Sequence, residues 1–280
     1  MTMQQDRIDL REAAQRLGVH YMTAYRYVRM GRLPATQDGG RWVVDPKDLK
    51  ALRPGRASAS RRGDARPESY RERLRARLLA GDEPGAWQVV ESFLVSGGTP
   101  KAALLDVLAP VMREVGAGWE SAEFSVGDEH RATAVAIRVV GRLGPMFARR
   151  GRPRGTVVVA CAPGDSHALP AAMVTCILRG EGYSIVELGG ATPVGDVVAE
   201  AEAAGDRLRG VVISVSSQAM LAAAGEAAAA VRAAVPDTTV LVGGPAVASA
   251  EDATALGSDG WSADAAGVAM LLDTLGRSAG

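Results

Sequence analysis

The sequence predicts a multidomain protein of α and α/β class: a winged helix-turn-helix, a four-helix bundle and a flavodoxin-like, doubly wound, five-stranded parallel sheet. Three observations predict it. A helix-turn-helix pattern with a basic second helix opens the chain, helical segments with Pro near their starts follow, and apolar β-branched runs then alternate with Ala-rich segments. With 280 residues, 47% of them hydrophobic, the chain is long enough for two or three packed domains.

The overall composition excludes several protein classes. The formal net charge is zero, with 32 Lys and Arg against 32 Asp and Glu, so nucleic-acid binding would require a local basic patch. Cys161 and Cys176 are the two cysteines, which argues against a disulfide framework. No stretch has the length of a membrane span or the pattern of a signal peptide, and we therefore expect a cytoplasmic protein.

Residues 1–52 are expected to form a winged helix-turn-helix DNA-binding domain. Apolar positions from Ala13 to Val28 indicate two helices with a tight turn at Gly18. Residues 31–45 then predict a hairpin wing, and residues 46–52 a closing helix. The polar side of the second helix carries Tyr21, Thr23, Arg26 and Arg29.

The phrases Gly31-Arg-Leu-Pro34 and Gly40-Arg-Trp42 make this segment resemble the MerR- and excisionase-like winged helix-turn-helix proteins. The resemblance implies that the second helix enters the major groove of DNA, with its polar residues at bases or phosphates. It also implies that Arg41, in the wing, contacts the backbone. The alternative is a small helical interaction module with a solvated basic face.

Residues 53–66 are rich in Pro, Gly, Ser and Arg and have no apolar period, which is typical of a basic flexible linker. Residues 67–150 are expected to form a four-helix-bundle cap domain, with helices over 70–80, 85–96, 99–116 and 125–149. Trp119 follows the third of these helices, and the pair Glu129-His130 lies in the fourth.

Residues 151–280 are expected to form a Rossmann-like domain, with strands near 155–161, 184–188, 210–214 and 238–242 and a weaker one near 259–262. Polar or Gly-rich turns follow three of these strands, and ligands collect at the carboxyl edge of such a sheet. A His two residues after a carboxylate can present one ring nitrogen while the other is held. These turns contain Asp165 and His167, Ser214 and Ser216, and Gly243 and Gly244.

The three turns resemble the cobalamin-binding signature Asp-x-His-x-x-Gly, Ser-x-Leu or Ser-x-Thr, and Gly-Gly, shared by methionine synthase, corrinoid proteins and the CarH/LitR photoreceptor-regulators. The resemblance implies that His167 is the cobalt ligand from below and that Asp165 orients it. The serines and glycines would line the slot for the nucleotide tail, where a Cβ would take up space. Pro170 stands where the family has Gly, and Ser216 where it has Leu or Thr. Pro170 is acceptable in the first turn of a helix.

Trp119, nine further residues and Glu129-His130 resemble the motif that the CarH/LitR family carries above adenosylcobalamin. The resemblance implies that the adenosyl side of the cofactor meets Trp119, Phe124, Val126, Glu129 and His130. In that family a His directly after the motif Trp caps cobalt after photolysis, and Glu120 stands there in this chain. Without the resemblance, the Glu-His pair could equally lie in the core or on the surface.

The sequence therefore predicts a cobalamin-binding transcriptional regulator whose adenosylcobalamin is photolysed by light, which controls homo-oligomerisation and DNA binding. We expect cobalamin, operator DNA and further copies of the chain, as a dimer or tetramer, as its partners, without a membrane. Two alternatives remain open: a corrinoid methyl carrier, and a regulator whose degenerate pocket senses another tetrapyrrole or a protein. No nucleophile triad, phosphate loop or metal-ligand cluster is present, so we do not expect an enzyme.

Overall fold

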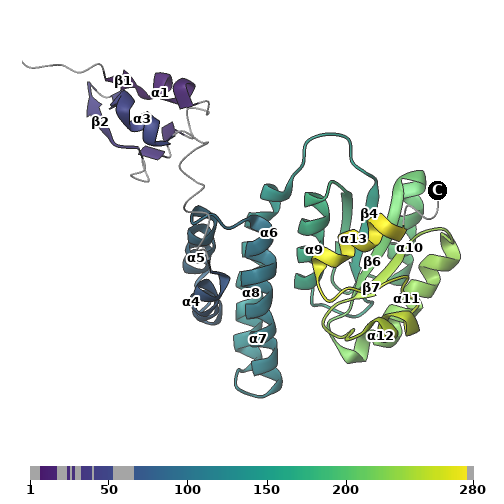
Figure 1. The fold of residues 1–280 in the computed structure, drawn as a ribbon. Coiled ribbons are helices and arrows are strands. Elements are labelled where there is room, and N and C mark those ends of the chain that lie inside the picture. Colours follow the sequence, from purple (N-terminus) through teal and green to yellow (C-terminus); the bar gives the residue numbers. More distant parts are fainter. Residues whose placement is uncertain are drawn as a thin grey trace, which may run out of the picture. The chain divides into compact units, whose positions relative to one another are not determined.

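The computed structural model describes residues 7–17, 24–25, 27–28, 33–39, 41–52 and 66–275. The chain divides into two compact units, Met1–Asp64 and Ala65–Gly280, which are described separately (Figure 1).

The first unit contains a three-stranded antiparallel sheet of order β1-β3-β2. Strands β2 and β3 form the hairpin that the sequence predicts, and α1 is capped by Asp9, whose carboxylate accepts the Glu12 N–H at 2.7 Å. Leu10, Leu17 and Leu33 are buried in its core. Its elements are β1 (Ile8–Asp9), α1 (Leu10–Leu17), β2 (Ala35–Asp38), β3 (Arg41–Val44) and α3 (Pro46–Leu52), and residues 24–25 and 27–28 are also helical.

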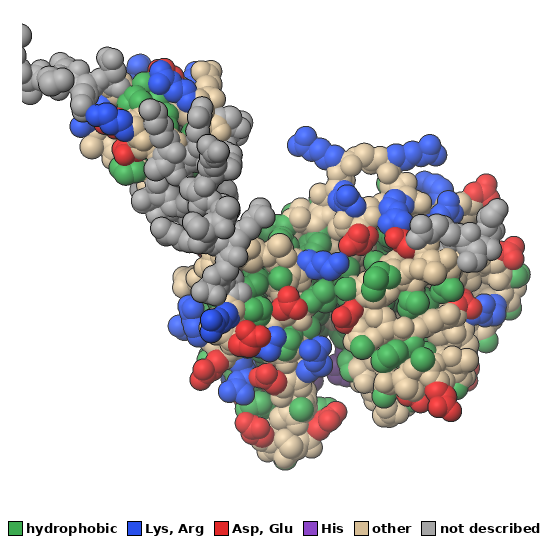
Figure 2. Space-filling view, in the orientation of Figure 1, with side chains coloured by type: hydrophobic (Ala, Val, Ile, Leu, Met, Phe, Trp, Pro, Cys, Tyr) green, Lys and Arg blue, Asp and Glu red, His purple; other side chains and the backbone are tan. Residues whose placement is uncertain are grey.

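The second unit begins with a helical bundle, on whose surface acidic and basic side chains are interspersed (Figure 2). Its last helix ends before Gly144 rather than at residue 149, because Pro145 cannot continue it and a short 3-10 turn follows. The helices are α4 (Pro67–Leu79), α5 (Glu83–Val95), the continuous run α6 (Pro100–Ala102), η1 (Ala103–Leu108) and α7 (Ala109–Glu120), then α8 (Val126–Leu143) and η2 (Gly144–Phe147).

The third helical run contains a π-helical stretch, η1, which the sequence pattern did not predict. Pro110 has no N–H and cannot bond the carbonyl of Asp106 four residues earlier. That carbonyl instead accepts a hydrogen bond from Nε of Arg71 at 2.7 Å. A helix that widens at a proline and has its freed carbonyl satisfied by a neighbour is a local adjustment of known type.

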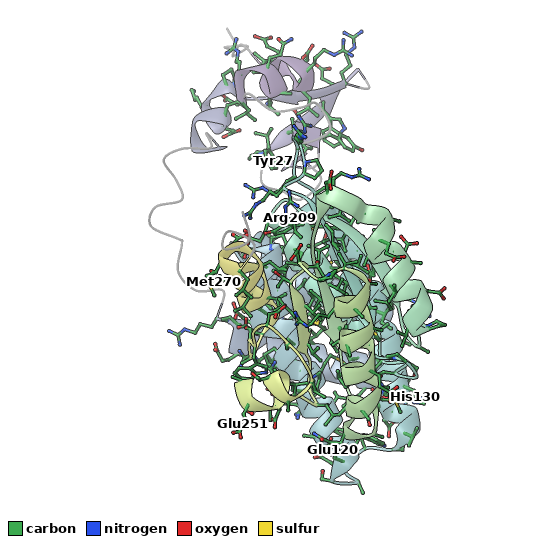
Figure 3. The ribbon with its side chains drawn as sticks, turned by 90° about the vertical axis from the view of Figure 1, so that its right-hand side faces the viewer. Tyr27, Glu120, His130, Arg209, Glu251 and Met270 are labelled. Carbon is green, nitrogen blue, oxygen red and sulfur yellow. The ribbon has the colours of Figure 1, made fainter. Side chains whose placement is uncertain are left out.

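The rest of the second unit is a doubly wound α/β domain with a parallel sheet of order β5-β4-β6-β7. Helices α9 and α13 contribute to the core on one face, and α10 and α11 to the core on the other. Met270 of α13, labelled in Figure 3, is 66% exposed. The elements are β4 (Thr156–Cys161), α9 (Leu169–Gly180), β5 (Ser184–Gly189), α10 (Val194–Ala204), η3 (Gly205–Arg207), β6 (Leu208–Ser214), η4 (Gln218–Met220), α11 (Leu221–Ala234), β7 (Val240–Gly243), α12 (Ala250–Ala255) and α13 (Ala265–Leu275).

The expectation of a fifth strand near 259–262 is wrong, because the sheet has four strands and this described segment contains none. The side chains of Asp259 and Ser258 accept the N–H groups of Val240 and Val242, both at 2.8 Å. These bonds satisfy the outward N–H groups of Val240 and Val242, and the Asp259 N–H donates to the Val240 carbonyl at 2.8 Å, so this edge is partly paired without a further strand.

The second unit is bound together by α9, which belongs to two cores. Leu169, Met173 and Ile177 are buried with the bundle helices, whereas Ala171 and Leu178 are buried against the sheet. Among the described helices, none combines the length and the apolar composition that crossing a bilayer demands.

Candidate functional site

The carboxyl ends of three neighbouring strands form the base of the candidate site. Cys161 pairs with Ser214 and Ser214 pairs with Gly243, so the three strands end side by side. The turns that follow them are therefore adjacent, as the sequence predicts for an open parallel sheet.

Asp165 is the buried centre of this edge, with 2% of its surface exposed. One carboxylate oxygen accepts the backbone N–H of His167 at 3.0 Å and lies 2.9 Å from His167 Nδ1. The other accepts the backbone N–H of Ser216 at 2.6 Å. The carboxylate thus holds the His turn and the Ser turn together.

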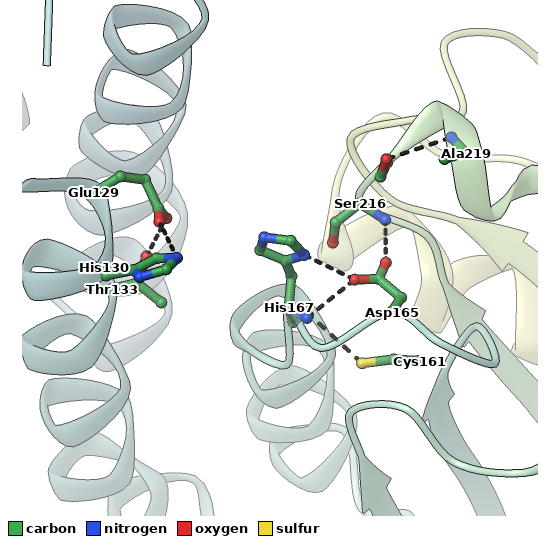
Figure 4. A network of polar contacts seen from close by, with 9 residues as sticks. Glu129, His130, Thr133, Cys161, Asp165, His167, Ser216 and Ala219 are labelled. Carbon is green, nitrogen blue, oxygen red and sulfur yellow. Dashed lines mark hydrogen bonds and ion pairs between the residues drawn. The ribbon is translucent and has the colours of Figure 1, made fainter. Parts of the chain in front are cut away.

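The ring of His167 is half exposed, with 51% of the side chain accessible (Figure 4). A carboxylate can only accept hydrogen bonds, so in the neutral ring Nδ1 carries the proton and Nε2 keeps its lone pair. The ring is thus held in a fixed orientation, and the lone pair of Nε2 is available to a metal. In the described residues no group of three or more His, Cys, Asp or Glu side chains could hold a metal ion. His167 therefore suits a metal that arrives already held by its own ligand.

Two buried hydroxyl groups lie beside the Asp165–His167 pair. Ser214 Oγ and Ser216 Oγ have no hydrogen-bond partner among the described residues. Figure 4 shows Ser216 beside Asp165, with its hydroxyl on the side of the His167 ring. An unpaired buried hydroxyl costs free energy, so two at one strand end indicate that a ligand supplies their partners. Thr175 and Thr238 also have unpaired hydroxyls, but they lie away from this edge.

The two glycines after β7 have different roles. A Cβ on Gly243 would meet no atom within 4 Å, so this position borders open space. A Cβ on Gly244 would lie 2.5 Å from the carbonyl oxygen of Val215, and its φ of +119° disfavours any other residue. Gly244 is thus required by the backbone itself, a second reason for glycine at this position beside the expected slot.

The upper side of the candidate site lies on α8. A capping box fixes its first turn, since Ser125 accepts the Asp128 N–H at 3.1 Å and Asp128 accepts the Ser125 N–H at 3.0 Å. One turn further, Thr133 donates to the carboxylate of Glu129 at 2.6 Å. His130 Nε2 lies 3.7 Å from that carboxylate, and its side chain is 71% exposed.

Figure 4 shows the His167 ring pointing toward the side of α8 that bears Glu129 and His130. In Figure 2 histidine is visible in the hollow between the bundle and the α/β domain. The structure thus places the two sequence motifs on facing sides of one opening.

The other upper-side residues lie around the turn from α7 to α8. Trp119 and Val126 are large exposed apolar side chains, at 47% and 52%. Phe124 is half-buried and packs on Gly118, where a Cβ would lie 2.4 Å from its ring. Glu120 is exposed at the end of α7, and Figure 3 shows it below His130 in the lower part of the view.

The predicted DNA contacts lie mostly outside the described residues. This holds for Tyr21, Thr23, Arg26 and Arg29. Arg41 is described: it opens β3, pairs across the hairpin with Asp38, and is exposed.

Sequence reasoning missed residues that support the site. Cys161 Sγ lies 3.7 Å from the carbonyl oxygen of His167, and burial raises the pKa of this thiol to about 11. The turn after β5 also packs here, because Ala191 N–H donates to the Asp165 carbonyl at 2.7 Å. Gly190 lets this turn approach, since a Cβ there would lie 3.0 Å from the Ser166 carbonyl oxygen. The pair Gly189-Gly190 at the end of β5 is the sequence signal that could have indicated this close approach.

Comparisons with known proteins agree with this architecture. Two profiles described as "B12 binding domain" match residues 70–143 and 155–269, and a "Helix-turn-helix domain" profile matches residues 8–53. The chain therefore belongs to the B12-binding-domain proteins and carries a helix-turn-helix at its start.

One curated protein and one solved structure are similar to this chain. The chain is 32% identical over 155 residues to "HTH-type transcriptional repressor CarH" of Myxococcus xanthus, which covers 54% of this chain and 50% of that protein. This confirms the resemblance to the CarH-type family, although the match spans only half of the curated relative's length. The monomethylamine corrinoid protein of Methanosarcina barkeri shares the fold, with a TM-score of 0.66 at 20% identity, over 74% of this chain and 99% of that one.

Proposed function

We propose that this protein is a cobalamin-binding transcriptional regulator. The observation that carries the proposal is the His167 ring, held at Nδ1 by buried Asp165 and presenting Nε2 beside two unpaired hydroxyls. Cobalamin brings a metal already held by a macrocycle, and His167 would supply this metal with one further ligand.

The residues at the sheet edge fit the lower part of this cofactor. His167 would coordinate cobalt in place of the cofactor's own base, and Asp165 would keep its ring oriented. Ser214 and Ser216 would donate to polar groups of the displaced nucleotide tail, which would satisfy hydroxyls that are otherwise unpaired. Gly243 borders open space where that tail could pass. Pro170 lies in the first turn of α9, where its missing N–H costs nothing.

The residues around α8 suit the upper face of adenosylcobalamin. Trp119 and Val126 expose apolar surface, Phe124 supports the turn between them, and Glu129 has a carboxylate positioned by Thr133. These groups offer apolar contact together with hydrogen-bond acceptors for an adenosyl group. The cofactor would supply a cobalt–carbon bond that light can break, so we propose that illumination changes assembly and DNA binding.

The helix-turn-helix segment would carry out the DNA binding that the proposed regulator controls. We propose that residues 1–52 bind operator DNA, with Tyr21, Thr23, Arg26, Arg29 and Arg41 at bases or phosphates. A corrinoid methyl carrier is the second candidate, because the corrinoid protein of M. barkeri matches over nearly its whole length. Such a carrier does not require a DNA-binding segment, and this chain has one matched by its own profile.

His167→Ala tests the proposal through the absorbance spectrum in the dark during titration with adenosylcobalamin. We expect the variant to lose about tenfold or more in affinity and to lack the spectral signature of imidazole ligation. His20→Ala is the matched control, because it removes a histidine of the first unit and should bind as wild type does. If His167→Ala binds as tightly as wild type with an unchanged spectrum, the proposal is wrong. A wild type that binds another tetrapyrrole but no cobalamin would favour the degenerate-pocket alternative.

A further inference from the structure

The amino edge of the parallel sheet, opposite the candidate cofactor site, is strongly basic. Three connections enter neighbouring strands there: residues 148–155 lead into β4, residues 181–183 into β5, and η3 into β6. The sheet order β5-β4-β6 places these connections next to one another. Together with the end of α9 and the start of β6, they carry Arg149, Arg150, Arg152, Arg154, Arg179, Arg207 and Arg209.

Two of these arginines are engaged with neighbouring acids. Arg154 pairs with Asp273 at 2.5 Å and stacks 4.8 Å above the centre of the Tyr183 ring. Arg179 lies 3.8 Å from the carboxylate of Glu187. These contacts hold the side chains of Arg154 and Arg179 in place on the basic edge.

Arg149, Arg150 and Arg152 are different, because all three are exposed and none has an ion pair or hydrogen bond to the described residues. They lie within four residues of one another on the connection between η2 and β4, which projects from the domain (Figure 1). Figure 2 shows Lys and Arg side chains extending from this part of the molecule. Like charges held this close repel one another, so an anion that neutralises them would be bound favourably.

The same connection borders a cavity of about 350 Å³, which is closed on its other side by Arg179, Glu181 and Tyr183. The cavity gives room for a phosphate group between the projecting loop and the fixed arginines. Arg209, labelled in Figure 3, extends the basic edge beyond it.

We propose that the arginines of residues 149–152 bind backbone phosphates of duplex DNA that the helix-turn-helix holds. This inference rests on the proposed DNA-binding function and extends it to a second, sequence-independent contact. A row of exposed arginines on a projecting loop matches the spaced phosphates of a duplex better than an enclosed small anion does. The chain as a whole is neutral, so this attraction is local to the amino edge.

The test compares the full-length wild type with Arg149→Gln/Arg150→Gln/Arg152→Gln on a fluorescent mixed-sequence duplex. Binding is measured in the cofactor state in which wild type binds, between about 50 and 200 mM salt. Arg73→Gln/Arg75→Gln/Arg113→Gln on the bundle helices α4 and α7 is the matched control, since it removes the same charge. We expect the loop variant to bind about tenfold or more weakly, with a salt slope reduced by about 2 to 3, and the control to change little.

The outcomes separate the two ideas. Equal affinity and salt slope in wild type and loop variant, or equal losses in loop variant and control, would overturn the inference and leave the proposed regulator standing. Failure of wild type to bind any duplex would instead overturn the proposed DNA-binding function. A thermal shift with sodium tripolyphosphate is measured in parallel. If tripolyphosphate stabilises wild type but not the loop variant, while duplex binding is unchanged, the site binds a free anion rather than DNA.

Discussion

Asp165 joins two turns through a single carboxylate. Its two oxygens face three donor groups: the backbone N–H groups of His167 and Ser216, and Nδ1 of His167. An ionised carboxylate can accept all of these, and no neutral side chain of the same shape can. The residue therefore sets the ring orientation and the position of the Ser turn together.

Asp165→Asn is expected to break this arrangement, because the amide NH₂ group must face at least one N–H donor. A buried donor left without a partner costs about 1–3 kcal/mol of unfolding free energy. Cobalamin affinity should fall about 10- to 100-fold, as it does when a supporting group of a metal ligand is removed. Urea unfolding and absorbance titration measure the two effects. Asp237→Asn changes an exposed carboxylate and should alter neither; equal behaviour of the two variants would show that Asp165 does not position the site.

The two buried thiols predict a loss of stability at alkaline pH. Burial raises the pKa of Cys161 and of Cys176 to about 11, from an ordinary value of 9.0. Between these values the unfolded chain releases thiol protons that the folded chain keeps, so stability is full below about pH 9 and falls as pH rises toward 11.

The full loss is at most about 3 kcal/mol per thiol, because each pKa unit corresponds to about 1.4 kcal/mol. Urea unfolding at several values between about pH 8 and pH 9.5 measures it. Tyr183, whose pKa is raised from 10.0 to about 12, contributes a similar loss only from about pH 10 upward. Cys161→Ala/Cys176→Ala should be less stable at neutral pH because it leaves cavities, but its stability should fall less steeply with pH. An unchanged slope would assign the alkaline loss to other groups.

At the scale of elements, the start of α8 decides where Glu129 and His130 lie. Ser125→Ala removes the cap and should cost about 1 kcal/mol. Because the first turn then frays, adenosylcobalamin should also be held less tightly. Ser249→Ala is the matched control, since Ser249 caps α12 by accepting the Asp252 N–H at 3.1 Å in the same way. It should cost stability without changing cofactor affinity. Equal effects on affinity would mean that α8 does not contact the cofactor.

Most elements could be predicted from the sequence because their signals are local. Apolar β-branched runs such as 156–160 identify buried strands, and Pro67, Pro84 and Pro100 lie near helix starts. The prediction of a fifth strand was wrong because the side chains of Ser258 and Asp259 accept hydrogen bonds from β7 that a neighbouring strand would otherwise accept. Neither the replacement of strand hydrogen bonds by side chains nor the widening of a helix into a π-helical stretch produces a periodic pattern in the sequence.

The site was predictable to the extent that it follows from strand ends. The turns with Asp165, Ser216 and Gly243 lie together because the strands are neighbours. The bond from Ser216 to Asp165 and the support from Ala191 could not be predicted, since both depend on how turns far apart in sequence pack. The basic amino edge was missed for the same reason, because its arginines gather only once the strand order is known.

At the scale of the second unit, α9 connects the two sides of the candidate site. It begins two residues after His167, and its side chains enter both the bundle core and the sheet core. Cores are close-packed, so a shift of the bundle against the sheet must be taken up at α9 or at the turn before it. The helix thus offers a physical route by which a change above the cofactor could alter the surface of the whole unit.

The upper side of the site bears on the light response that we propose for this protein. The resemblance to CarH/LitR photoreceptors implies a His directly after Trp119, but Glu120 occupies that position and is exposed. A carboxylate is a poor substitute for imidazole at cobalt. His130, on the side of α8 toward which His167 points, is then the remaining imidazole of the second unit that could reach the upper face (Figure 4).

We expect the illuminated adenosylcobalamin complex to change its absorbance spectrum with pH or with added imidazole, because no histidine is fixed on the upper face. Light should also change assembly, measured by gel filtration, less than a fixed histidine would. Glu120→His should suppress the response to imidazole by supplying the missing ring. If His130 moves in after photolysis, the wild-type spectrum will resist imidazole and His130→Ala will become sensitive. A pH-insensitive spectrum that persists in His130→Ala would show that neither account of the upper face is correct.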